Sequence, residues 1–380
     1  MGLVGGGEGA FIGAVHRLAA ELDGDVELVC GAFASDPDRS RRAGRQLYGL
    51  AAARSYGSSD EMFTRERAMS EAQRMDFVVI ATPNHTHFPI AQAALQAGFH
   101  VVCDKPVTFD LAQARELRRI VRDSGRVFAL THNYTGYPMV KEARRIVRAN
   151  EIGTVRRVLV EYLQGWLASD VETGGSKQAG WRTDPARSGA AGCFGDIGTH
   201  AENLVEYVTG LRIESLCADL NIFVPNRRLD DDGSVLLRYA GGARGTLTAS
   251  QIAIGEENAL SLRVYGERGS IEWHQQEPNT LLVKWPDRST QVRRTGGPDV
   301  ASAASAAARL PAGHPEGFLE GFANLYRGVA AAIRAQRDGR APADGALDFP
   351  TIDDGVRGMA FIETVVESSK RGGEWLQFPQ

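Results

Sequence analysis

The first half of the chain alternates short apolar runs with amphipathic stretches. Strands are predicted at 3–4, 26–33, 77–81, 100–103 and 127–131, and helices at 14–22, 90–98 and 111–124. Because the apolar runs are nearly continuous in Val, Ile and Ala, we expect strands that are covered on both faces. Strands that alternate with helices in this way form βαβ units around a parallel sheet. The pattern predicts an α/β domain over residues 1–131.

A different pattern begins after residue 153. Extended strands are predicted at 154–164, 213–223, 234–239, 245–251, 260–265, 270–273 and 281–285, with glycine-rich turns between several of them. Strands this close together favour a large, open-faced, mostly antiparallel sheet. One helix, at about 196–209, interrupts them and is stopped by Gly210. The segment 301–308 fits either a flexible loop or a short helix, and helices at 318–334 and 351–369 are expected to pack back on the body. The prediction is a second α/β domain over 132–380.

Composition narrows the class of protein. The chain has 380 residues, 43% of them apolar and 24% charged, with a formal net charge of −4. These values are ordinary for globular domains and give no sign of a nucleic-acid partner. No apolar run reaches the ~18 residues of a membrane span, and the four cysteines form no CxxC pair that would indicate a zinc site. We expect a soluble cytoplasmic protein without a metal. As a hypothesis, the natural chain starts upstream of Met1, because the first strand begins only two residues later.

A glycine-rich segment joins the first strand to the first helix. It contains Gly5, Gly7, Gly9 and Gly13, with Phe11 and Ile12 at the start of the helix. A strand, a glycine turn and a helix N-terminus form a site for a phosphate, so a dinucleotide fits here. The strict GxGxxG spacing fails at Ala10, and Gly13 is the better candidate for the close-packing glycine. A flexible glycine loop is the plainer interpretation.

The second strand lacks the usual ribose-binding acid at its end. Ala34 stands in that position, followed by Ser35, Asp36 and, further on, Arg39. Asp36 either binds the ribose or caps the helix that begins at Pro37. We expect NAD as the cofactor, and the choice between NAD and NADP stays open.

Polar residues follow two of the predicted parallel strands. The run 77–81 leads into Thr82-Pro83-Asn84-His85-Thr86-His87, and the run 100–103 leads into Asp104-Lys105-Pro106. Both segments are expected at the sheet edge where ligands bind in open α/β folds. The plainer interpretation makes the histidines cap or core residues and Lys105-Pro106 a surface turn.

Asp196 and His200 are four residues apart and fall on one face of a helix. Asp/His pairs at this spacing are common on solvated helices, but this one also supplies a base with an orienting acid. Oxidation of an alcohol needs a bound nicotinamide, a base for the hydroxyl proton and a group that stabilises the developing alkoxide. The glycine segment, His200 and Lys105 match these needs, and the combination favours a dehydrogenase.

Taken together, these motifs resemble those of the Gfo/Idh/MocA oxidoreductase family. They are the glycine-rich turn, the 82–87 segment, Asp104-Lys105-Pro106, Asn133-Tyr134, Trp181-Arg182 and Asp196…His200, in the family's order along essentially the whole chain. The resemblance implies a Rossmann domain, a second α/β domain for substrate binding and oligomerisation, and a homodimer or homotetramer. It implies that Lys105 contacts the reacting hydroxyl, that His200 is the general acid/base and that Asp196 positions the substrate. The residues it places near the nicotinamide and its ribose are Thr82, Pro83, Asn84, His87, Asn133, Trp181 and Arg182, with Asp104 in place of the family's usual glutamate.

The segments 162–166 and 180–182 look like those of the family's sugar-oxidising branch. A ring such as that of Trp166 can stack on a pyranose while Gln164 binds hydroxyls, although Trp166 fits a core position equally well. His314 precedes the last long helices and either approaches the site or packs at a helix start. The expected substrate-binding residues are Lys105, Tyr134, Gln164, Trp166, Asp196, His200 and His314.

These features predict an NAD(P)-dependent dehydrogenase acting on a secondary hydroxyl of a sugar, glycoside or cyclitol. A redox-neutral enzyme that passes through a keto-sugar on tightly bound NAD would use the same residues. A non-catalytic dinucleotide sensor is a third alternative, but it has no need of Lys105, Asp196 and His200. A metal hydrolase is disfavoured, because acids and histidines do not otherwise cluster at ligand spacing.

Overall fold

The computed structural model describes residues 1–341 and 347–379, which divide into two compact units. The first unit comprises Met1–Thr131 and Phe322–Val356, and the second comprises His132–Gly321 and Arg357–Gln380. The chain therefore passes from the first unit to the second after Thr131. Residues 322–356, which the sequence analysis assigned to the second domain, group with the first unit.

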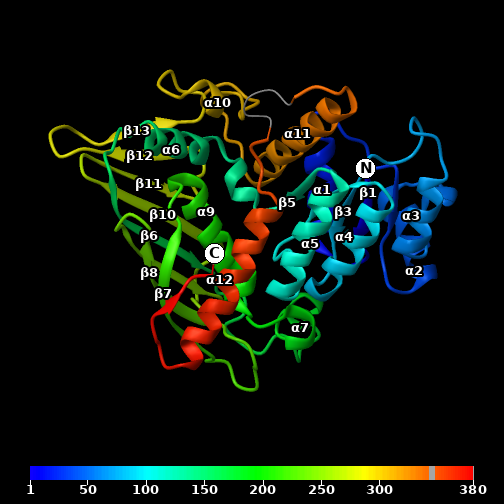
Figure 1. Ribbon diagram of the computed structural model, residues 1–380, viewed down its shortest axis with the longest axis horizontal. Helices are drawn as coiled ribbons and strands as arrows, with labels where there is room; N and C mark the ends of the chain where they lie inside the picture. The colour runs from blue at the N-terminus through cyan, green and yellow to red at the C-terminus, as the bar shows by residue number, and fades with distance from the viewer. Residues whose placement is uncertain (342–346, 380) are drawn as a thin grey trace. The chain divides into compact units, whose positions relative to one another are not determined.

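The first unit is built on a five-stranded parallel sheet with the order β2-β1-β3-β4-β5 (Figure 1). Its strands are β1 (Gly2–Gly5), β2 (Cys30–Ala32), β3 (Phe77–Ala81), β4 (His100–Cys103) and β5 (Phe128–Leu130). Its helices include α1 (Phe11–Glu21), α2 (Pro37–Tyr48), α3 (Ser59–Arg67), α4 (His87–Gln96) and α5 (Leu111–Ser124). The predicted parallel α/β fold is confirmed. The second strand is shorter than the predicted 26–33, because its partner β1 begins only at Gly2, which pairs with Cys30.

The strand order places a ligand site at one edge of this sheet. After β1 the chain moves to β2 on one side of β1, and then crosses to β3 on the other side. Ligands of open α/β sheets bind outside the carboxyl ends of the strands at such a reversal. Gly5 and Ala81, the last residues of β1 and β3, are paired there.

The second unit contains a nine-stranded sheet with the order β13-β12-β11-β10-β6-β9-β8-β7-β14. Its strands are β6 (Val155–Leu163), β7 (Ile213–Asn221), β8 (Asp232–Tyr239), β9 (Arg244–Ser250), β10 (Ala259–Gly266), β11 (Ser270–His274), β12 (Thr280–Lys284), β13 (Gln291–Arg294) and β14 (Leu376–Gln377). Seven of these were predicted. The edge strands β13 and β14 were missed, because β13 has a polar sequence and β14 is two residues long. The sheet is antiparallel throughout except for the parallel pair β6 and β9, so the mostly antiparallel sheet is also confirmed.

Two helices cover one face of this sheet. They are α6 (Pro138–Arg148) and α9 (Thr199–Thr209), which pack on each other and on the sheet strands, as Figure 1 shows. The sequence analysis did not place α6, although Pro138 opens it. The remaining helices are α7 (Lys177–Arg182), α8 (Pro185–Ser188), α10 (Ser302–Ser305), α11 (Phe318–Arg337) and α12 (Ile352–Lys370). Of the two alternatives for 301–308, the short helix is the one observed.

The predicted helix at 196–209 is made of two elements. A π-helical turn, η4 (Phe194–Gly198), leads into α9, which ends at Gly210 with φ of 70°. π-Helical turns are frequent at functional sites. The start of this segment is held by the buried carboxylate of Asp230, which accepts hydrogen bonds from the backbone N–H groups of Gly192 (2.7 Å) and Phe194 (2.8 Å).

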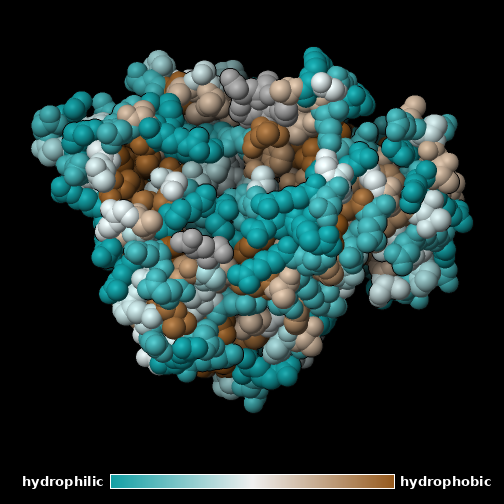
Figure 2. Space-filling view, viewed as in Figure 1, coloured by the Kyte–Doolittle hydropathy of each residue, from teal (hydrophilic) through white to brown (hydrophobic). Residues whose placement is uncertain are grey.

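The face of the molecule seen in Figure 2 is mostly hydrophilic, with apolar side chains in small patches. Within the described residues, no helix combines the length and the apolar character needed to cross a membrane.

Asp230 gives the stability of the protein a specific pH dependence. Burial raises the pKa of this carboxyl from 3.8 to about 6, although the two backbone donors oppose the rise. The folded protein therefore holds a proton that the unfolded chain loses, and stability falls as pH rises from about 4 to 6, by up to about 3 kcal/mol. Asp230→Asn removes this proton but sets an amide N–H₂ against a backbone donor, which costs about 1–3 kcal/mol. Urea unfolding at pH 4.5 and pH 7 should show a smaller pH difference in the variant; equal differences would contradict this assignment.

Candidate active site

The glycine segment of the first unit is packed too closely for side chains. A Cβ on Gly5 would lie 2.2 Å from the carbonyl oxygen of Ala81, and one on Gly7 would lie 2.3 Å from that of Phe33. A Cβ on Gly13 would lie 2.4 Å from Cα of Gly6. These are backbone atoms that cannot swing away. The close packing at these three positions favours a defined turn over a flexible glycine loop.

Two aromatic side chains hold this turn in place. The hydroxyl of Tyr48, on α2, donates to the carbonyl oxygen of Gly6 at 2.5 Å. The ring of Tyr48 stacks on that of Phe33, which follows β2, with centroids 4.4 Å apart. Tyr48 and Phe33 were not predicted as site residues, because their partners are distant in sequence.

The residues after β2 lie at the surface. Ser35, Asp36 and Arg39 are exposed, and the side chain of Asp36 accepts from the backbone N–H of Arg39 at 2.7 Å. The carboxylate of Asp36 therefore caps α2. A contact from these three residues to the adenosine ribose stays a prediction.

His87 ties two strand ends together inside the first unit. It is fully buried, and its Nδ1 and Nε2 lie 2.8 Å from the carbonyl oxygens of Pro106 and Thr82. Burial lowers the pKa of His87. Asn84, in the short 3₁₀ turn η2 (Asn84–Thr86), is also buried. His87 thus holds the segment beginning at Thr82-Pro83 against the segment that follows Lys105.

A chain of hydrogen bonds holds the half-buried Asp104. Its Oδ1 accepts from the hydroxyl of Thr131 at 2.5 Å and lies 3.0 Å from Nε2 of His16. On the other side of the His16 ring, Nδ1 lies 2.6 Å from the hydroxyl oxygen of Tyr326. Burial alone would raise the pKa of Asp104, but the charge and hydrogen bonds of its neighbours lower it overall. Asp104 therefore stays ionised next to Lys105. Sequence reasoning missed His16, which carries no local signal.

The residues present fit a dinucleotide. The N-cap of α1 is Ala10, which has no side chain to accept from the first-turn N–H groups, so the helix start suits an anion. The side-chain-free surface at Gly5, Gly7 and Gly13 allows a ligand to approach the backbone. In the second unit, the buried Nδ2 of Asn133 has no hydrogen-bond partner among the described residues.

Three amide side chains of the second unit gather at one edge of its sheet. Gln164 follows β6 and Gln251 follows β9, and because these strands are parallel, their carboxyl ends meet at the same edge. Asn258 precedes β10, which is antiparallel to β6 and so begins at that edge. Nε2 of Gln164 donates to Oδ1 of Asn258 at 2.7 Å. Gln251 and Asn258 were missed from the sequence, because the strand pairing was not known.

Asp196 joins this edge through two partners. Its Oδ2 accepts from Nε2 of Gln251 at 2.9 Å and from Nε of Arg182 at 3.1 Å. The Arg182 guanidinium lies 4.3 Å from the ring centroid of Trp181 and 5.9 Å from that of Trp166. Trp166 is 38% exposed, so the core interpretation of this residue is wrong. Its Nε1 donates to Oε1 of Gln164 at 3.0 Å.

His200 is nearly buried, at 8% exposure, and is enclosed by rings. Its Nδ1 lies 3.3 Å from Nδ1 of His132, and the ring of Tyr134 meets it edge to face at 4.9 Å. The hydroxyls of Tyr134 and Tyr162 are 2.5 Å apart, and Tyr162 donates to Oδ1 of Asn258 at 2.7 Å. Burial raises the pKa of both phenols. The tyrosines therefore keep their protons, and a base role for the His200 imidazole stays a prediction.

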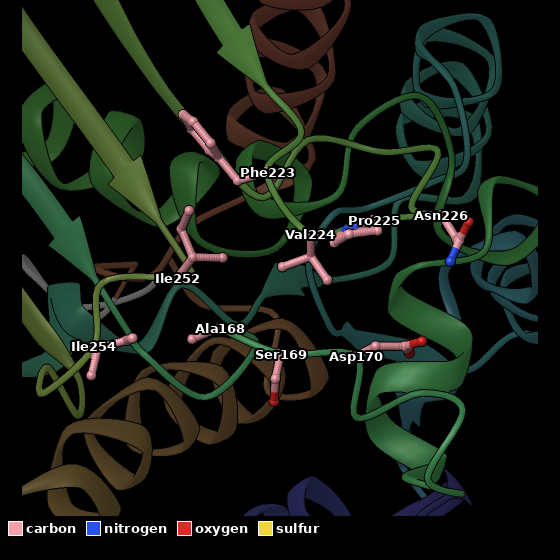
Figure 3. Close-up of a pocket in the computed structure, with 9 residues that line it drawn as sticks. All are labelled: Ala168, Ser169, Asp170, Phe223, Val224, Pro225, Asn226, Ile252 and Ile254. Carbon is pink, nitrogen blue, oxygen red and sulfur yellow. The ribbon is translucent and has the colours of Figure 1, made fainter.

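Within the described residues, His314 makes no hydrogen bond, ion pair or ring contact with the side chains around His200. It is exposed, and its Nδ1 lies 3.1 Å from the carbonyl oxygen of Pro311 in its own loop. A separate cavity of about 500 Å³ lies among three loops of the second unit, at 168–170, 223–226 and 252–254 (Figure 3). None of the predicted site residues lines it. In the described part of the chain, no three His, Cys, Asp or Glu side chains converge in a way that could hold a metal ion.

Comparison with known proteins matches both units. Residues 1–132 match the model described as an oxidoreductase family with an NAD-binding Rossmann fold, and residues 140–272 match the GFO/IDH/MocA C-terminal domain. The chain is 34% identical to the uncharacterised oxidoreductase YfiI of Bacillus subtilis, over 99% of this chain and 96% of that protein. It is 27% identical to levoglucosan dehydrogenase of Pseudarthrobacter phenanthrenivorans, over 100% of this chain and 98% of that protein.

A solved structure is also similar throughout. The crystal structure of an inositol dehydrogenase homologue from Azotobacter vinelandii, complexed with NADH and myo-inositol, has a TM-score of 0.91 and 36% sequence identity. The match covers 99% of this chain and 97% of that one. With both domain models matched in order, the resemblance seen in the sequence is confirmed: the chain belongs to the Gfo/Idh/MocA oxidoreductase family.

Proposed function

We propose that this protein is an NAD-dependent dehydrogenase that oxidises a secondary hydroxyl of a cyclitol or sugar. The observation that carries the proposal is the cluster around His200 and Asp196. It combines a sheltered imidazole base, a carboxylate held by Arg182 and Gln251, and amide side chains at one sheet edge. A protein that only senses a dinucleotide has no use for such a proton-transfer cluster.

The proposed reaction needs one proton acceptor and one group that stabilises negative charge. NAD⁺, when bound, supplies the hydride acceptor. His200 takes the hydroxyl proton, because the neighbouring phenols of Tyr134 and Tyr162 have raised pKa values and keep theirs. Lys105 follows directly after Asp104 at the end of β4, and we assign it the stabilisation of the forming alkoxide. Asp196 orients the substrate.

The substrate class follows from the groups at the sheet edge. The amide side chains of Gln164, Gln251 and Asn258 supply hydrogen-bond donors and acceptors that suit hydroxyl groups. The ring of Trp166 is partly exposed and suits packing against the C–H face of a six-membered ring. Two relatives support the same class: the Azotobacter vinelandii homologue, whose structure is complexed with NADH and myo-inositol, and levoglucosan dehydrogenase. A homodimer or homotetramer remains part of the proposal.

His200→Ala should remove the base without disturbing the dinucleotide segment. We expect kcat to fall about a hundredfold or more, with the Kd for NADH unchanged. His274→Ala is the matched control, because this exposed histidine pairs with Glu272 on a sheet strand. Steady-state kinetics and NADH fluorescence titration measure both quantities. Full turnover in His200→Ala would overturn the assignment.

Gly7→Ala should weaken cofactor binding. The new Cβ would lie 2.3 Å from the carbonyl oxygen of Phe33, so the turn must shift, and loss of one backbone hydrogen bond to a charged phosphate costs about 1.5–3 kcal/mol. We therefore expect the Kd for NADH to rise about tenfold. Gly358→Ala is the control, because its Cβ would meet nothing within 4 Å. An unchanged Kd in Gly7→Ala would show that the dinucleotide binds elsewhere.

The function itself is tested by supplying NAD⁺ or NADP⁺ with a panel of inositols, sugars and glycosides. We expect reduced nicotinamide to accumulate with one polyol class, and faster with NAD⁺. Conversion of a substrate with no net reduction of the dinucleotide would favour the redox-neutral alternative. If neither dinucleotide binds, the proposal fails.

A further inference from the structure

A second histidine lies beside the proposed base. His132 begins the second unit, and its Nδ1 lies 3.3 Å from Nδ1 of His200. The rings meet edge to face, with centroids 5.1 Å apart and planes at 87°. His132 is 2% exposed, so the contact is sheltered from water. The proposed dehydrogenase reaction assigns no role to His132.

The direction of this one hydrogen bond decides whether His200 can act. Two facing ring nitrogens share a single hydrogen, because one must donate and the other accept. If Nδ1 of His200 donates, a neutral His200 keeps the lone pair of Nε2 for the hydroxyl proton. If Nδ1 of His132 donates instead, a neutral His200 carries its hydrogen on Nε2, and the imidazole cannot take a proton there.

We propose that His132 is a positioning residue that accepts the Nδ1 hydrogen of His200 and so keeps Nε2 of His200 ready for the substrate. This inference rests on the proposed dehydrogenase function. Tyr134 supports it from a second side, because its ring meets that of His200 at 74° and resists rotation of the imidazole.

The contact between His132 and His200 also suits the state of His200 after it has accepted the proton. The hydroxyl hydrogen forms a bond to Nε2 of His200, while the C–H hydrogen leaves with its electron pair as hydride to the nicotinamide. His200 is then a cation, and its Nδ1–H bond to His132 becomes charge-assisted and about twice as strong as before. His200 afterwards releases the proton to water. The titratable neighbours Tyr134 and Tyr162 do not compete for the proton, because burial raises the pKa of both, and Asp196 is paired with Arg182.

Two substitutions of His132 distinguish a hydrogen-bond acceptor from a side chain that only fills space. His132→Phe keeps a ring of similar size and removes the acceptor, whereas His132→Asn offers Oδ1 in the position of Nδ1. We expect kcat of His132→Phe to fall about 10- to 100-fold with little change in KM, and His132→Asn to recover most of the loss. Equal losses in both variants, or none in His132→Phe, would overturn the proposal.

A spectroscopic readout tests the contact without substrate or cofactor. In protein with isotope-labelled histidine, imidazole nitrogen NMR reports the tautomer of His200, with His200→Asn providing the assignment. We expect Nδ1–H in the wild type and in His132→Asn, and Nε2–H in His132→Phe. An Nε2–H tautomer in the wild type would refute the inference even if the variants fold poorly. If His200 carries its hydrogen on Nδ1 but the protein oxidises no polyol, the proposed dehydrogenase function is refuted. The proposed direction of the hydrogen bond between His200 and His132 is then retained.

Discussion

The parallel pairing of β6 with β9, inside a sheet that is otherwise antiparallel, is the constraint on which the candidate substrate site depends. It brings the carboxyl ends of two strands to one edge, and the antiparallel neighbour β10 begins there as well. Gln164 and Gln251 meet at this edge because β6 and β9 are parallel, and Asn258 joins them because β10 is antiparallel to β6. With β9 reversed, Gln251 would lie at the opposite edge, away from Asp196.

In each unit, hydrogen bonds hold a half-buried carboxylate of the candidate site. Asp104 is held by His16 and Thr131 in the first unit, and Asp196 by Arg182 and Gln251 in the second. Burial of an unpaired charge is costly, so these partners are what allow carboxylates to stand beside the proposed catalytic groups. Both sets of side chains are therefore organised before any ligand arrives.

Sequence reasoning succeeded where the signal is local. The strands at 77–81 and 100–103 and the helix at 111–124 have the predicted limits, because each is a continuous apolar or periodic run between clear breaks. Asp196 and His200 were also selected from local spacing, and their catalytic roles stay predictions. Contacts between distant segments carried no such signal: His132 and His200 are 68 residues apart, and His16 and Asp104 are 88 apart. One available clue was overlooked, since His132 directly precedes the recognised pair Asn133-Tyr134 after a parallel strand.

Transfer of deuterium tests the central claim most directly. The protein would be given NAD⁺ and the polyol that it converts, labelled with deuterium at the carbon of the reacting hydroxyl, and the dinucleotide would be examined by mass spectrometry. The account predicts one deuterium in NADH for each carbonyl formed. A polyol that is converted while the dinucleotide gains no deuterium would contradict hydride transfer to NAD⁺.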